Sequence, residues 1–127
     1  MIVAGLGCRR GTSADELEKV VRLALGRHDL PAEQLAAIAT ESAKATEPAF
    51  PELARRLSVP LVACTVADLD RVAGQVLTPS KLALEAKGLP SIAEASAVVA
   101  AGRNAQLLGA RIATERATCA IAAGEGR

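Results

Sequence analysis

The chain has 127 residues, of which 50% are hydrophobic, and its formal net charge is +1 at pH 7. This length suits one domain with a hydrophobic core, so we expect a single domain over residues 1–127. A near-neutral charge and a single aromatic residue, Phe50, argue against nucleic-acid binding, which relies on basic surfaces and stacking side chains. No apolar stretch approaches the roughly 20 residues of a membrane span. We therefore expect neither a nucleic-acid nor a membrane partner.

Cysteine and histidine are too few to suggest a disulfide framework or a metal site. The three cysteines, Cys8, Cys64 and Cys119, form no CxxC pair, and His28 is the only histidine. A disulfide framework and a zinc site are both poorly supported by this pattern. At the N-terminus the positive charges follow the apolar residues, whereas a signal peptide carries them first. We expect a cytoplasmic protein that uses neither a metal nor another cofactor.

The first elements are a strand and a strongly patterned helix. Residues 2–7 form a short apolar run that ends in glycines and predicts a buried strand. Residues 13–26 predict a helix, because Ser13 and Glu16 form a capping box and Gly26 is a plausible end. One face of this helix is apolar and carries Leu17, Val20, Val21, Ala24 and Leu25.

The middle of the chain alternates strands and helices. Residues 34–40 predict a second strand and residues 60–66 a third. Between them, residues 48–57 predict a helix with an early proline. Residues 66–73 predict a short helix whose start is capped by Thr65.

Two helices and a hairpin complete the chain. Capped helices are predicted over residues 78–88 and 91–102, and the tail reads as two strands, 105–113 and 117–123. Alternating strands and helices imply a parallel sheet with helices on both faces. We therefore expect a three-layer α/β domain with a mostly parallel central sheet and a C-terminal antiparallel hairpin.

The loop GLGCRRGTS, residues 5–13, lies between the first strand and the first helix. Ligands of open α/β sheets sit beyond the carboxyl ends of strands, and free N–H groups at a helix N-terminus attract anions. Arg9 and Arg10 add forked donors suited to carboxylate or phosphate. The spacing is no dinucleotide fingerprint, since position 10 is arginine. The loop predicts a site for an anionic small molecule; the alternative is a tight turn with solvated arginines.

Cys8 lies in this loop beside two cations and a helix N-terminus. We expect this setting to lower the pKa of its thiol and to yield a reactive thiolate, which makes Cys8 a candidate nucleophile. No histidine lies nearby in the sequence to act as its base. The alternative is a small residue that fills the loop.

Two further stretches carry candidate ligand contacts. Residues 39–47 follow the second strand, and Lys44 within them is a candidate second anion contact. Residues 88–97 combine a glycine turn with a helix start. There, Glu94 is either the capping partner of Ser91 or a carboxylate that faces the pocket.

Together these stretches resemble the CobE / CbiG C-terminal family of cobalamin biosynthesis. The resemblance is carried by GLGCRRG (5–11), by IATESAKATEPAFPELARRLSVPL (38–61), and by GLPSIAEASAVVAAG (88–102) with the two-strand tail. It spans essentially the whole chain. Because nothing precedes Met1, we expect a protein similar to the family's stand-alone form rather than to the module that ends a longer chain.

The resemblance implies an α/β domain with a cytoplasmic role in corrin-ring construction. It implies an accessory or carrier protein that binds a precorrin-type tetrapyrrole, with other corrin-pathway enzymes as further partners. A polycarboxylate macrocycle suits the arginines and helix N-termini noted above. The residues that match the family pattern are Gly5, Gly7, Cys8, Arg9, Arg10, Gly11, Thr40, Lys44, Glu47, Ser91 and Glu94.

Two other functions remain open at this point. One is an enzyme similar to CbiG, which opens a precorrin lactone and releases acetaldehyde, with Cys8 or Glu94 as the candidate catalytic group. The other, outside corrin chemistry, is a nucleotide- or phosphate-binding α/β domain. The absence of the standard nucleotide-binding fingerprints disfavours this last function.

Overall fold

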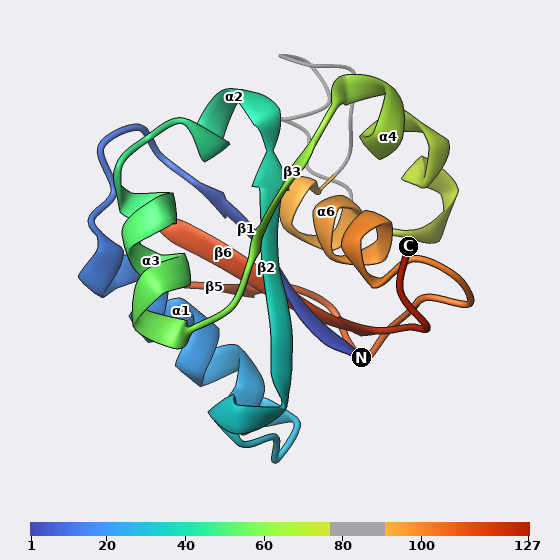
Figure 1. The fold of residues 1–127 in the computed structure, drawn as a ribbon, viewed down its shortest axis with the longest axis horizontal. Coiled ribbons are helices and arrows are strands. Elements are labelled where there is room, and N and C mark those ends of the chain that lie inside the picture. The colour runs from blue at the N-terminus through green and yellow to red at the C-terminus, as the bar shows by residue number, and fades with distance from the viewer. Residues whose placement is uncertain (77–90) are drawn as a thin grey trace.

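The fold is built around one open sheet with helices on both faces (Figure 1). The computed structural model describes residues 1–76 and 91–127, and the helix expected over residues 78–88 lies outside them. In the described part, the sheet has six strands in the order β3-β2-β1-β6-β4, and β5 also pairs with β6. The strands are β1 (Ile2–Cys8), β2 (Leu35–Glu41), β3 (Leu61–Cys64), β4 (Gln106–Leu107), β5 (Ile112–Ala113) and β6 (Ala117–Ala123). β1, β2 and β3 are parallel, whereas β6 is antiparallel to β1.

The helices form a layer on each side of this sheet. On one side lie α1 (Ala14–Arg27) and α3 (Ala49–Leu57), and on the other lie α6 (Ile92–Ala101) and α4 (Val66–Arg71). Shorter turns are α2 (Ser42–Ala45), η1 (Ala32–Gln34) and η2 (Ala73–Gln75). The expected fold class is confirmed. Within the described ranges the longest helix, α1, has 14 residues, which is too few for a transmembrane span.

α1 forms where its capping pattern predicts it. Ser13 Oγ accepts the N–H of Glu16 at 3.2 Å, and the expected apolar stripe is buried against the sheet beside Phe50. The helix continues through Arg27, so Gly26 does not end it. The left-handed residue after the helix is Asp29, two residues beyond Arg27, with φ of 55°.

Two expected strands are shorter in the structure. We expected one strand over residues 105–113, but this segment forms two, β4 and β5, which both pair with β6. Between them the chain leaves the sheet, and the Arg111 N–H donates to Glu94 Oε2 at 2.8 Å. The expected strand over residues 60–66 ends at Cys64, because Thr65 already serves as the N-cap of α4.

α6 packs directly on the backbone of β1. A Cβ atom on Gly5 would lie 2.1 Å from the carbonyl oxygen of Ala93 and 2.5 Å from the nitrogen of Ala97. A glycine on the strand and alanines on the helix therefore allow the two backbones to approach more closely than larger side chains would permit.

This contact yields a stability prediction with a matched control. Gly5→Ala should destabilise the protein by roughly 3 kcal/mol or more, because the added methyl group meets backbone atoms that cannot move independently. Gly26→Ala adds the same methyl group to a helical position with nothing within 4 Å, and should stabilise by about 0.5–1 kcal/mol. Urea unfolding of the two variants measures both effects. A Gly5→Ala protein as stable as the parent would contradict the close packing.

Candidate functional site

Several segments meet at the edge where the parallel strands end (Figure 1). The loop of residues 9–13 leads from β1 to α1, α2 follows β2, and Thr65 leads from β3 to α4. α6 begins close by, since a Cβ atom on Gly7 would lie 3.7 Å from the Cβ of Ile92. Open α/β sheets bind their ligands at this edge, which makes it the candidate site.

Hydrogen bonds hold the backbone of the loop after β1. The Arg9 N–H donates to the Arg116 carbonyl at 3.0 Å, and Arg116 Nη2 donates to the Arg10 carbonyl at 3.1 Å. Thr12 Oγ1 donates to the Arg9 carbonyl at 2.7 Å. Gly11 has φ of 79°, a left-handed conformation that glycine adopts without strain. Arg9 and Arg10 themselves are exposed at the mouth of the loop.

A carboxylate of the protein is already bound to this loop. The Gly11 N–H donates to Glu47 Oε1 at 3.2 Å, and Lys44 Nζ lies 3.2 Å from Glu47 Oε2. The Gly11 hydrogen bond is the main cause that lowers the pKa of Glu47, and the charges of Lys44 and Arg10 act in the same direction. We call these three residues, Gly11, Lys44 and Glu47, the carboxylate corner. Lys44 thus already has an anionic partner within the protein.

Cys8 does not have the lowered pKa that we expected. Burial raises the pKa of its half-buried thiol above the ordinary value, and this outweighs the lowering by the charge of Lys44 and by a hydrogen bond with Thr12. Glu47 and Glu41 raise the pKa further. The sequence suggested two cations beside the thiol but not its desolvation or the nearby carboxylates. In the described part of the chain, no three His, Cys, Asp or Glu side chains group to hold a metal ion.

Thr40 is placed to support the sheet. It is fully buried, and its hydroxyl donates to the Leu6 carbonyl at 2.8 Å. Ser42 makes a similar link on the other side, where its hydroxyl donates to the Cys64 carbonyl at 3.0 Å. These bonds connect the end of β2 to β1 and β3, and so fix the position from which α2 starts.

The start of α6 is buried behind the end of β1. Ser91 Oγ accepts the N–H of Glu94 at 3.3 Å, which confirms the expected cap. Glu94 is fully buried, and its Oε2 accepts the N–H of Arg111 at 2.8 Å. The Ser91 cap agrees with the first reading of Glu94, as the capping partner of Ser91, and its carboxylate also holds the segment before β5. A role of Glu94 towards a ligand stays a prediction.

The structure brings Cys8, Gly11, Lys44 and Glu47 together, with Arg10 close enough for its charge to act on Glu47. Sequence reasoning missed Arg116, which holds the loop backbone. The role of Arg116 can be recognised only once β6 is known to pair with β1. In that pairing Ala117 lies opposite Cys8, which places Arg116 next to Arg9. The ligand-binding roles of the candidate residues stay predictions.

Comparison with known proteins identifies the family of this chain. Residues 2–122 match the model of the family described as "Cobalamin synthesis G C-terminus". The chain belongs to this family. A curated relative, Protein CobE from Sinorhizobium sp, is 34% identical over 121 residues, which cover 95% of this chain and 79% of the relative.

Two solved structures of similar sequence superpose on this fold. The crystal structure of CobE, "a protein from the cobalamin (vitamin B12) biosynthetic pathway", is 36% identical, with a TM-score of 0.93 over 100% of this chain and 92% of that one. Cobalamin biosynthesis protein chiG from Agrobacterium tumefaciens str. C58 is 35% identical, with a TM-score of 0.75 over 98% of this chain and 99% of that one. This CobE-like chain is a protein of cobalamin biosynthesis.

The raised pKa of Cys8 predicts slow alkylation near neutral pH. In the folded protein, iodoacetamide should modify Cys8 more slowly than free cysteine at about pH 7.5, and the rate should keep rising beyond about pH 9. Cys64, with a pKa of about 11, and the fully buried Cys119 should react more slowly still. Mass spectrometry of the labelled peptides measures the three rates. A Cys8 rate that levels off below about pH 8 would restore the thiolate hypothesis.

Proposed function

We propose that this protein binds a polycarboxylate precorrin or corrin-ring intermediate at the carboxyl-end edge of its sheet, as a carrier or accessory protein. The carboxylate corner is the observation that carries the proposal. The Gly11 N–H and Lys44 Nζ both bind the carboxylate of Glu47, each at 3.2 Å. Donors that bind a carboxylate of the protein itself are also suited to bind a carboxylate of a ligand. Membership of a cobalamin biosynthesis family makes a corrin precursor, with its acetate and propionate groups, the ligand class to expect.

The exposed arginines extend this corner towards solvent. Arg9 and Arg10 lie directly before Gly11, and neither is taken up by an ion pair within the described residues. A guanidinium binds carboxylates through two parallel N–H donors, and two of them in sequence can engage separate carboxylates of one macrocycle. The N-terminus of α1 adds its positive end at the same place.

The environments of the two candidate catalytic groups favour binding over catalysis. The Cys8 thiol has a raised pKa and is therefore a weak nucleophile near neutral pH. Glu94 is fully buried and binds the Arg111 N–H. We further propose that the intermediate passes to or from other enzymes of the corrin pathway in the cytoplasm.

Removal of the two arginines tests the binding site. Arg9→Ala/Arg10→Ala should weaken binding of a hydrogenobyrinic-type corrin by roughly tenfold or more, because each charge-assisted hydrogen bond contributes about 1.5–3 kcal/mol before solvent screening. Absorbance titration of the corrin measures the affinity. The double variant Arg22→Ala/Arg55→Ala removes the same charge from exposed positions on α1 and α3 and should change the affinity little. Equal affinities for the two double variants would refute the assigned site.

For the carboxylate corner we predict the opposite effect, a substitution that tightens corrin binding. If a ligand carboxylate uses the donors of Gly11 and Lys44, Glu47 competes with it, and Glu47→Ala should tighten corrin binding by about fivefold. Glu52→Ala removes an equal charge from α3, outside the corner, and serves as the control. Weaker binding by Glu47→Ala would show instead that Glu47 acts only to hold the loop in shape.

A further inference from the structure

β3 is the outermost strand on one side of the sheet (Figure 1). Among the described residues only β2 pairs with it, so its outer side has no neighbouring strand there. Ala63 is exposed on this lateral edge, and Leu61 is half-buried. An open strand edge is a template for a further strand, and proteins usually block it with charges, proline or a bulge.

The backbone of β3 turns every second residue outward. The Ile38 N–H of β2 donates to the Pro60 carbonyl at 3.1 Å, and the parallel register then continues without a bulge. In a parallel ladder, alternate residues of a strand direct their polar backbone groups at the same neighbour. Pro60 and Val62 therefore face β2, whereas the N–H and C=O groups of Leu61 and Ala63 point outward.

The usual blocks do not close this edge. Pro60 lacks an N–H, but it faces β2, so the outer side loses no donor. Residues 57–67 contain no charged side chain. The opposite edge of the sheet is different, because β4 and β5 have two residues each and the chain leaves the sheet between them. Of the two lateral edges, the one at β3 is therefore better suited to pair with another strand.

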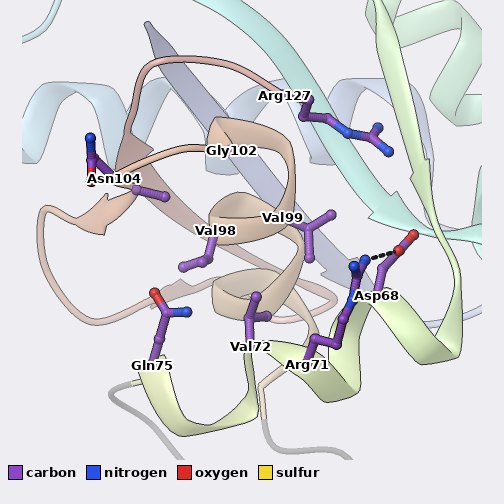
Figure 2. A pocket seen from close by; sticks show the side chains of 10 residues that line it. Asp68, Arg71, Val72, Gln75, Val98, Val99, Gly102, Asn104 and Arg127 are labelled. Carbon is purple, nitrogen blue, oxygen red and sulfur yellow. Dashed lines mark hydrogen bonds and ion pairs between the residues drawn. The ribbon is translucent and has the colours of Figure 1, made fainter.

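The open stretch is closed at both ends. The Val59 N–H donates to the Ala54 carbonyl at 3.0 Å, at the end of α3. The Thr65 N–H donates at 3.1 Å to the carboxylate of Asp68, which also pairs with Arg71 (Figure 2). Because the donors at both ends are engaged, only the outward groups between them are available, and this fixes the register of a docking strand.

We propose that a second copy of this chain occupies the edge, so that two β3 strands pair antiparallel about a two-fold axis at Val62. Leu61 then lies opposite Ala63 of the second copy, and Ala63 opposite Leu61 of that copy. Each pair exchanges both N–H···O=C hydrogen bonds. The edge is its own complement, because both copies present the same donors and acceptors. A formal net charge of +1 gives little repulsion between copies.

This pairing joins two sheets into one and leaves both candidate sites open. Antiparallel strands point in opposite directions, so the carboxyl-end edges of the two copies lie at opposite ends of the joined sheet. The dimer is therefore independent of the proposed corrin site. Because the paired stretch is short, its interface is small and the dimer is weak.

Sedimentation velocity and NMR test the association in the unmodified protein. The sedimentation coefficient should rise from the monomer to the dimer value between about 1 µM and about 1 mM protein. The N–H signals of Leu61 and Ala63 should shift over the same range, whereas that of Ala113 on β5 should not. A chain that stays monomeric throughout, or a dimer whose shifts lie elsewhere, would overturn the second copy as the occupant of this edge.

Two proline variants locate the contact. Ala63→Pro removes an outward N–H but no bond to β2, and should weaken dimerisation by at least about tenfold. Ala113→Pro is the matched control, because Ala113 is exposed at the opposite edge. Its N–H points away from β6, since the next residue, Thr114, donates its N–H to the Ala117 carbonyl at 2.8 Å. This variant should dimerise like the parent.

A charged variant tests the same edge without proline. Ala63→Lys places a lysine where natural edge strands often carry one, and should also weaken dimerisation, whereas Ala113→Lys should not. Urea unfolding verifies that each variant is folded. A folded Ala63→Pro or Ala63→Lys protein that dimerises like the parent would contradict the proposal.

Discussion

The direct contact between α6 and β1 is the constraint on which both ends of the molecule depend. Gly5 lets the helix backbone rest on the central strand, and Ala93 and Ala97 keep the approach open. The position of the helix is thereby fixed along its length. Its start is buried beside Gly7 at the carboxyl edge of the sheet, and its end meets the C-terminal segment, where Gly102 bridges to Gly126.

Burial of the helix start explains the role of Glu94. A carboxylate in an apolar layer is costly unless it is hydrogen-bonded. Here it sits at the positive end of α6 and accepts the Arg111 N–H, so the helix and the segment before β5 stabilise it together. The same bond lies in the gap between β4 and β5, where the chain leaves the sheet. One buried side chain thus helps to place the segment between β4 and β5.

At the carboxyl end of β1, contacts within the protein hold the loop that leads to α1. Glu47 binds the Gly11 N–H and Lys44, and Arg116 holds the carbonyl of Arg10. These contacts join residues far apart in the chain and leave the two loop arginines exposed. A loop organised in this way loses little conformational entropy when a ligand binds, because its backbone is already held.

The sequence by itself determined the local elements. The caps at Ser13, Thr65 and Ser91 each depend on an N–H three residues away, and the apolar stripe of α1 follows from helical periodicity, so both can be recognised within one segment. The position of the loop between β1 and α1 followed from the same order of strand, glycine and helix. Only the tertiary structure decided the pKa of Cys8, the bond from Gly11 to Glu47, and the approach of Arg127 to Asp68. Desolvation and charge act through space between residues that the sequence keeps far apart, so no local pattern records them.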